Sequence, residues 1–269
     1  MKRYALMILS SLLILSVLAG CGGAKTVPGA SGGGGTQAAS KTPTIDKIKQ
    51  DGKLLVGTSP DYPPFETLDK ANNVIGFDAD IMQAVATKLG VKVEFVQMDF
   101  GGLIAALGAR KFDVLAAGVS VSEERKKAVD FSTPYLIGKD AIVVHKDSGL
   151  KVTKLEDLKG KTVAVQIGTV QADAAHKVDG ITVKEYNLFT EAAAAVSAHQ
   201  ADAVYLHTVV GHAFVKANPN LVIAGELPAA DTAYALRKET PDLTVVVNQV
   251  LDDLQKSGEM DKLVQKWFK

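Results

Sequence analysis

The stretch DFGGLIAALGARKFDVLAAGVSVSEERKKAVDFSTPY, residues 99–135, decides the fold class. It begins with apolar residues at helical spacing, continues with the apolar run FDVLAAGV, and ends in a charged segment that contains Arg125. A helix, a buried strand and a further helix start in this order are typical of an open α/β sheet. The stretch therefore predicts an α/β protein in which Arg125 follows the carboxyl end of a strand.

The same alternation extends along the chain in both directions. Strands are predicted at residues 53–59, 91–97, 112–119, 161–169, 181–187, 201–206 and 232–237. Helices are predicted at residues 76–90, 99–111, 170–178 and 190–200, and two more follow Pro241, the second with Leu263, Trp267 and Phe268. Asp78 is the predicted N-cap of the first helix, which Gly90 ends. Residues 105–119 and 194–208 align with each other: each reads as a helix, then any residue and an aspartate, then a strand. The similarity is due either to chance or to two similarly built lobes.

The N-terminal segment predicts export. Residues 1–20 combine Lys2 and Arg3 with an apolar run that is short for a membrane span, as in a signal peptide. The run ends in LAGC, which resembles a lipobox, and Cys21 is the only cysteine of the 269 residues. We expect Cys21 to be lipidated, with a cleaved signal lacking a lipid as the alternative. Residues 21–44, rich in Gly, Ser and Ala, are predicted to be the lipidated N-terminus and a flexible linker.

Composition excludes some functions. Thirty basic and thirty acidic residues give a formal net charge of zero, and no basic block occurs outside the signal, so no nucleic acid partner is predicted. About 225 residues remain for the folded part, enough for one large core or two smaller ones. In an open α/β sheet, ligands bind beyond the carboxyl ends of the strands. This rule selects residues 59–65, 118–125, 166–170 and 207–208.

Five ordered segments, DYPPF, GFDAD, residues 99–135, DLKGKTVAVQIGT and SGEMDKLVQKWF, resemble the extracellular solute-binding proteins (family 3) of polar amino-acid ABC transporters. The resemblance implies a two-lobed periplasmic-binding-protein type II fold, in which each lobe is an open mixed sheet flanked by helices and two hinge strands join the lobes. Lobe 1 would be residues 45–139 plus 231–269, and lobe 2 residues 140–230. The hinge would fall near residues 137–141 and 228–231.

The resemblance assigns the group that binds a ligand carboxylate. Arg125 would bind it through a bidentate pair, for which the planar guanidinium is suited. The alternative is that Arg125 pairs with Glu123 or Glu124 on a solvated helix start. Ser120 would assist the carboxylate, and so would Thr169 at a helix N-terminus. The carbonyl group of Gly118 would accept from the ligand amino group.

Other positions would contact the ligand side chain. The resemblance places Tyr62 and Phe100 on either side of it, although Phe100 is also compatible with ordinary core packing. Ser59 stands where binders of basic amino acids carry an acid, which disfavours a Lys or Arg ligand unless Asp61 substitutes. Gln166 faces the ligand side chain and would supply an amide.

Two residues depart from the family pattern. Val170 stands where a threonine often adds a hydroxyl to the carboxylate site, and it keeps only its backbone N–H. His207 stands where the family carries an aspartate that pairs with the ligand ammonium. A neutral imidazole nitrogen would accept from an ammonium weakly, and a protonated ring would repel it. Either the ligand amino group is absent, substituted or held differently, or an ordinary amino acid binds with compensation by Asp61 or carbonyl groups.

The sequence therefore predicts an exported, lipid-anchored, monomeric binding protein that delivers a small carboxylated solute to a membrane permease. No cofactor, metal or catalytic activity is predicted. The alternative is a dehydratase-like enzyme on the same fold, for which His207, Glu66 and Asp61 are the available acids. His199, His207 and His212, spaced eight and five residues apart, match no common zinc pattern.

Overall fold

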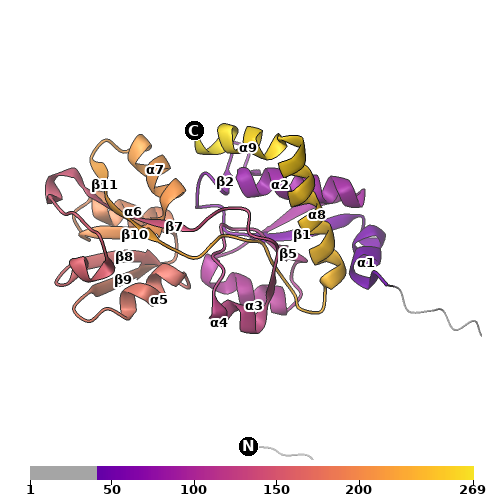
Figure 1. The fold of residues 1–269 in the computed structure, drawn as a ribbon, viewed down its shortest axis with the longest axis horizontal. Helices are drawn as coiled ribbons and strands as arrows, with labels where there is room; N and C mark the ends of the chain where they lie inside the picture. The colour runs from indigo at the N-terminus through magenta and orange to yellow at the C-terminus, as the bar shows by residue number, and fades with distance from the viewer. Residues whose placement is uncertain (1–40) are drawn as a thin grey trace, which may run out of the picture. The chain divides into compact units, whose positions relative to one another are not determined.

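Residues 41–269, which the computed structural model describes, contain two separate five-stranded sheets flanked by helices (Figure 1). The strands of the first sheet, in spatial order, are β4 (Lys92–Gln97), β1 (Lys53–Thr58), β5 (Val114–Leu115), β12 (Ala235–Leu236) and β6 (Asp130–Phe131). β4, β1 and β5 are parallel, whereas β12 is antiparallel to both of its neighbours. The sheet is therefore mixed. β4, β1 and β5 run parallel, as strands joined by crossover helices do, and β12 runs in the opposite direction.

Helices cover both faces of the first sheet. They are α1 (Pro43–Asp51), α2 (Phe77–Leu89), α3 (Leu103–Gly108), α4 (Glu123–Ala128), α8 (Pro241–Ser257) and α9 (Glu259–Phe268), with a short 3₁₀ turn, η1 (Phe100–Gly102), before α3. α2 contacts α8 and α9 on one face, and α3 packs on the other face (Figure 1). Ile81 and Val85 of α2 are fully buried, and each contributes about 1.5–3 kcal/mol of hydrophobic stabilisation. The hairpin of β2 (Thr67–Leu68) and β3 (Val74–Ile75) precedes α2.

The second sheet has a similar plan. Its strands, in spatial order, are β11 (Leu221–Pro228), β7 (Lys139–His145), β10 (Ala203–His207), β8 (Thr162–Gln166) and β9 (Thr182–Tyr186). Its helices are α5 (Val170–His176), α6 (Phe189–Ser197) and α7 (Thr208–Ala217), with 3₁₀ turns η2 (Lys146–Ser148) and η3 (Leu155–Leu158). β10, β8 and β9 are parallel, and β7 is antiparallel to both β10 and β11. The prediction of a mixed α/β fold with two sheets is confirmed.

The chain crosses between the sheets twice, through residues 132–138 and 229–234, here called the crossing segments. The segments bond to each other: Thr232 N–H donates to the Leu136 carbonyl at 2.9 Å, and Gly138 N–H donates to Asp231 Oδ1 at 2.9 Å. A Cβ atom on Gly138 would lie 2.0 Å from the Ala230 carbonyl oxygen, so only glycine fits there. Below, lobe 1 is the part built on the first sheet and lobe 2 the part built on the second.

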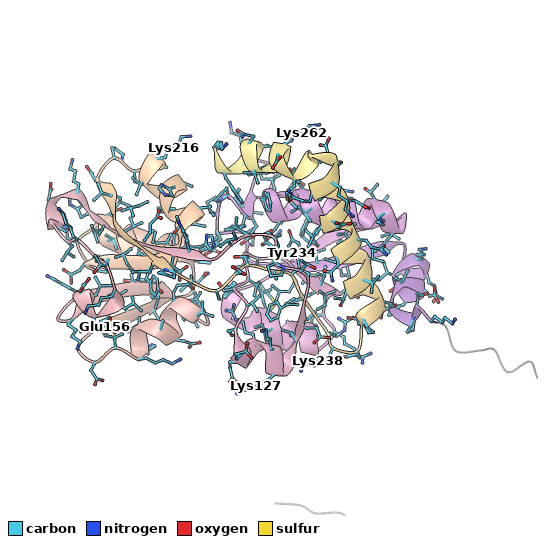
Figure 2. All side chains as sticks on the ribbon, viewed as in Figure 1. Lys127, Glu156, Lys216, Tyr234, Lys238 and Lys262 are labelled. Atoms are coloured by element: carbon cyan, nitrogen blue, oxygen red, sulfur yellow. The ribbon has the colours of Figure 1, made fainter. Side chains whose placement is uncertain are left out.

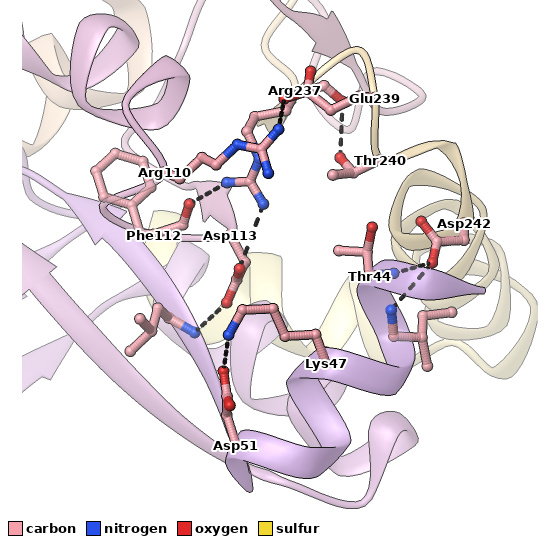
Figure 3. A network of polar contacts seen from close by, with 12 residues as sticks. Thr44, Lys47, Asp51, Arg110, Phe112, Asp113, Arg237, Glu239, Thr240 and Asp242 are labelled. Atoms are coloured by element: carbon pink, nitrogen blue, oxygen red, sulfur yellow. Dashed lines mark hydrogen bonds and ion pairs between the residues drawn. The ribbon is translucent and has the colours of Figure 1, made fainter. Parts of the chain in front are cut away.

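The two ends of lobe 1 are tied together by polar contacts (Figure 3). Asp242, in the first turn of α8, accepts from the backbone N–H groups of Thr44 at 2.9 Å and Ile45 at 3.1 Å, both in α1. Arg237, just after β12, donates to the Phe112 carbonyl and lies 3.5 Å from Asp113. These contacts hold the C-terminal part of the chain against lobe 1.

The predicted helix cap at Asp78 is wrong. Gly76 is the N-cap of α2, and Asp78 is its second residue. The buried Asp78 carboxylate accepts from Gly118 N–H at 2.9 Å and from the hydroxyls of Tyr135 at 3.1 Å and Tyr234 at 3.0 Å. Tyr234 is fully buried inside lobe 1 (Figure 2). Three donors from distant segments hold this side chain in the core, so it is not available to cap its own helix.

Some predictions fall on residues outside the described part of the chain. The signal at residues 1–20, Cys21 and the linker up to residue 40 lie there. None of the helices within residues 41–269 is both long and apolar enough to cross a membrane. The same residues contain no group of three or more His, Cys, Asp or Glu side chains placed to hold a metal ion.

Candidate functional site: the junction of the two lobes

The predicted site residues gather where the carboxyl ends of the strands of both lobes meet. Ser59 follows β1, Gly118 and Ser120 follow β5, Gln166 ends β8 and His207 ends β10. Within residues 41–269, three side chains of lobe 1 form hydrogen bonds with lobe 2. The Arg125 guanidinium bonds to Gly168, the Asp61 carboxylate to Phe189 and Gln166, and the Tyr62 hydroxyl to His207.

Arg125 lies buried at this junction, with 8% of its surface exposed. Ser122 caps α4 by accepting from the Arg125 backbone N–H at 3.2 Å, which fixes the start of the helix. The guanidinium donates through Nη1 to the Ser120 carbonyl at 2.6 Å and through Nη2 to the Gly168 carbonyl at 3.0 Å. It also lies 5.5 Å from the centre of the Phe100 ring, within cation–π range.

The alternative role of Arg125 in a surface ion pair is wrong. Glu123 pairs with Lys126 at 2.8 Å, and Glu124 pairs with Lys127 on the outer surface of α4 (Figure 2). Burial lowers the pKa of Arg125 to about 10, an effect that the charge of Asp173 partly offsets. The group therefore stays cationic at neutral pH and faces the junction with its charge uncompensated by an ion pair within residues 41–269.

Asp61 connects the lobes through its carboxylate. Oδ1 accepts from the Ser59 hydroxyl at 2.9 Å, while Oδ2 accepts from Gln166 Nε2 at 3.2 Å and from the backbone N–H of Phe189 at 2.5 Å. Burial raises the pKa of Asp61, and these hydrogen bonds act in the opposite direction. Two predicted ligand contacts, Ser59 and Gln166, are thus brought together by an acid between them.

Tyr62 and Phe100 occupy different surroundings. The Tyr62 hydroxyl accepts from the His207 backbone N–H at 2.9 Å, and its ring meets Phe189 edge-on at 5.0 Å. Phe100, in η1, is half-buried and lies against the Arg125 guanidinium. Both aromatic rings therefore lie at the lobe junction.

His207 is buried, with 3% of its surface exposed, and is the N-cap of α7. Its Nδ1 accepts from the Val209 N–H at 3.4 Å, so the neutral ring carries its proton on Nε2, which has no hydrogen-bond partner. Burial lowers the pKa of His207 to about 4, and the ring is neutral at physiological pH. An Nε2–H group donates and does not accept, so His207 in this form is unsuited to receive a ligand ammonium.

Gly118, Thr169 and Val170 shape the backbone at the junction. Gly118 has a left-handed φ of 55°, and a Cβ there would lie 3.2 Å from the rings of Tyr62 and Phe65. The Thr169 hydroxyl donates to the Gln166 carbonyl at 2.7 Å and accepts from Ala172 N–H at 3.1 Å as the cap of α5. Val170 is the first residue of that helix.

Sequence reasoning missed Asp140. This residue follows the first crossing segment, is 2% exposed, and accepts from Gln171 Nε2 at 2.9 Å. The one available signal was an aspartate directly before the apolar run AIVV, residues 141–144, since an acid that enters a buried strand needs a specific partner.

A hollow of about 550 Å³ opens at the junction. It is lined by Met98, Asp99, Gly101, Gly102, Ile167 and Asn187, which come from both lobes. Neither this hollow nor one of about 600 Å³ between α2 and α8 is lined by any of the predicted site residues. The junction hollow adjoins the predicted site in sequence, because Gly101 follows Phe100 and Ile167 follows Gln166.

Two α/β lobes joined by two crossing segments, with a buried cation and backbone polar groups at their junction, define a two-lobed solute-binding protein. The chain belongs to the bacterial extracellular solute-binding proteins, family 3, whose model matches residues 54–269. The resemblance predicted from the sequence is confirmed.

Similar proteins carry amino-acid-binding names. The chain is 35% identical to the arginine-binding extracellular protein ArtP of Bacillus subtilis (strain 168), over 80% of this chain and 86% of ArtP. A mutant of ArgBP from T. maritima is 47% identical with a TM-score of 0.81, covering 83% and 98% of the two chains. An ancestral amino-acid-binding protein, a precursor of cyclohexadienyl dehydratase, is 39% identical with a TM-score of 0.78, covering 84% and 100%. These relatives are binding proteins, and one of them has a descendant that is a dehydratase.

Proposed function

We propose that this chain captures an α-amino acid between its lobes and delivers it to the membrane permease of an ABC importer. The observation that carries the proposal is the buried Arg125 guanidinium, which spans the two lobes by bonding to Ser120 and Gly168. A planar, permanently charged guanidinium in a low-dielectric junction is suited to bind a carboxylate through two parallel hydrogen bonds. Ser120, and the start of α5 at Thr169 and Val170, lie beside it to complete a carboxylate site.

Closure of the lobes is the proposed mechanism. A ligand that contacts both lobes stabilises the closed arrangement over the open one, and only that difference in affinity shifts the population. The crossing segments are the proposed hinge, because they are the covalent connections between the two sheets. The permease would then recognise the closed form.

L-Arginine is the proposed ligand. The relative ArtP is named for arginine binding, and Asp61 supplies an acid near Ser59, where binders of basic amino acids carry one. The Asp61 carboxylate forms no ion pair with a Lys, Arg or His within residues 41–269, so a guanidinium that displaced one of its hydrogen-bond donors would supply the missing positive charge. The ring of Tyr62 beside it adds an aromatic face for a cation.

Calorimetry on the mature protein tests this proposal. The panel contains the standard L-amino acids together with deaminated and N-alkylated carboxylates. We expect L-arginine to bind tightest and agmatine, which lacks the carboxylate, to bind at least about 100-fold more weakly. A protein that binds no member of the panel, or binds agmatine as tightly as L-arginine, would refute it.

Export and anchoring are part of the same proposal. The LAGC sequence supports lipidation of Cys21, and the family description supports an extracellular location. We propose that the mature chain works as a monomer held at the cell envelope by that lipid. Cell fractionation of the wild type and of Cys21→Ser tests it: the variant should leave the membrane fraction, and an unchanged distribution contradicts the anchor.

A further inference from the structure

The proposed function leaves the charge of one ligand group without a counterion, because the Gly118 carbonyl that the family resemblance assigns to the ligand amino group is neutral. An α-amino acid carries an ammonium next to its carboxylate, and His207 stands where the family carries the aspartate for it. The His207 ring is neutral, buried, and presents an Nε2–H donor, so it cannot neutralise that charge. A buried ammonium without a negatively charged partner is disfavoured. A carboxylate near this edge of lobe 2 would supply that charge.

Asp140 is the direct cross-strand neighbour of His207. The register of β10 with β7 pairs the two residues, as it pairs Leu206 with Ala141. Paired residues of an antiparallel ladder direct their side chains to the same face of the sheet, with Cβ atoms about 4.5–5.5 Å apart. The Asp140 carboxylate is therefore displaced by a single strand from the place where the family carries its own.

Asp140 is also connected to the neighbouring parts of the site. Its Oδ1 accepts from Gln171 Nε2 at 2.9 Å, and Gln171 lies in the first turn of α5, two residues after Thr169. Burial raises the pKa of Asp140 to about 6, and side-chain hydrogen bonding with Gln171 and with Tyr205, two residues before His207, acts in the opposite direction.

The Asp140 carboxylate has no cationic partner in the described chain. It is 2% exposed, and no Lys, Arg or His of residues 41–269 lies within ion-pair distance. Two neutral donors leave lone pairs of the carboxylate unused. A buried acid in this position gains most from a cation that arrives with the ligand.

We propose that Asp140 receives the α-ammonium of the bound amino acid, in place of the aspartate that the family carries at position 207. The inference rests on the proposed function. The α-amino acid would then lie between Arg125, which binds its carboxylate, and Asp140, which binds its ammonium.

Calorimetry with paired ligands tests the role of Asp140. L-Arginine is compared with 5-guanidinopentanoate, which lacks the α-amino group, and L-glutamine with glutaramate. Asp140→Asn should bind L-arginine about 10- to 150-fold more weakly than the wild type, and 5-guanidinopentanoate within about threefold of it. The control is Asp202→Asn, which neutralises an acid at the opposite end of β10 that accepts from Thr162 N–H, and it should change neither affinity by more than about twofold.

The outcomes separate this inference from the proposed function. A wild type that binds none of the standard L-amino acids contradicts the proposed function. A wild type that binds the amino acid and its deaminated analogue equally, or an Asp140→Asn variant that loses both equally or neither, overturns the role of Asp140 alone. A crystal structure of the wild type with L-arginine requires no variant. An Nα atom within about 3.2 Å of an Asp140 oxygen supports the role, and a longer distance overturns it.

Discussion

Replacing Arg125 by alanine is expected to weaken ligand binding by about 10²- to 10⁴-fold. The two guanidinium nitrogens Nη1 and Nη2 both face the lobe junction, where they lie 2.6 Å and 3.0 Å from carbonyl oxygens of the two lobes. A carboxylate in this place would accept two charge-assisted hydrogen bonds, each worth about 1.5–3 kcal/mol. The sum of about 3–6 kcal/mol corresponds to the stated loss, since 1.4 kcal/mol is tenfold in affinity.

The same substitution should change stability little. Gly168 is exposed, so water can replace the donor that its carbonyl group loses, whereas Ser120 is buried and only one buried carbonyl group loses this donor. We expect the melting temperature to fall by no more than about 4 °C. Arg125→Lys keeps the charge but loses the planar fork, and its affinity should lie between those of the wild type and the alanine variant.

Arg237→Ala is the matched control. Arg237 is as buried as Arg125, at 7% exposed, but its contacts with Phe112 and Asp113 lie within lobe 1 (Figure 3). Its removal leaves the Phe112 carbonyl without this donor, so the melting temperature should fall by several degrees while the affinity stays within about threefold. Calorimetry and thermal unfolding of the three variants measure both quantities. An Arg125→Ala protein that is folded and binds L-arginine like the wild type would refute the carboxylate assignment.

Three further substitutions have expected outcomes. Gly138→Ala would place a Cβ 2.0 Å from the Ala230 carbonyl oxygen, so thermal unfolding should show a melting temperature several degrees lower. Gly118→Ala has to adopt a φ of 55° beside the Tyr62 ring, and urea unfolding should show a loss of about 1–2 kcal/mol; equal stability would contradict the strain. Burial raises the pKa of Asp78 from 3.8 to about 6, so the fold disfavours its ionised form. The unfolding free energy of the wild type relative to Asp78→Asn should therefore fall by roughly 2–3 kcal/mol as pH rises from about 4 to 6, and parallel pH curves would contradict this.

The sequence predicted the elements that local pattern determines. Apolar runs such as residues 53–59 gave buried strands, and the rule for the carboxyl ends of strands selected the loops that meet at the junction. Helix α7 was not predicted, because Thr208–Ala217 is apolar on several sides and contains Gly211. That glycine has a packing reason that only the fold reveals: a Cβ there would lie 3.0 Å from the Cβ of Ala141 on β7.

Contacts between segments that are distant in the sequence could not be predicted from local sequence pattern. Asp78 was read as a helix cap because an acid at a helix start usually is one, whereas its donors Gly118, Tyr135 and Tyr234 lie 40 to 156 positions away. Asp140 was missed for the same reason, since its relation to His207 depends on the register of two strands that the chain brings together from far apart. Residue types and spacing carry no direct record of such a register.

Three hydrogen bonds across the junction share one feature that bears on specificity. Arg125, Asp61 and Tyr62 of lobe 1 each bond through a side chain to a backbone group of lobe 2, at Gly168, Phe189 and His207. A side chain of lobe 2 can therefore change without removing these three bonds, because the backbone group stays. Residue 207 can therefore be a histidine, where the family resemblance leads us to expect an aspartate, while its backbone N–H still donates to Tyr62. The Asp61–Gln166 hydrogen bond differs, because Gln166 contributes a side-chain group of lobe 2 and its substitution would remove that contact.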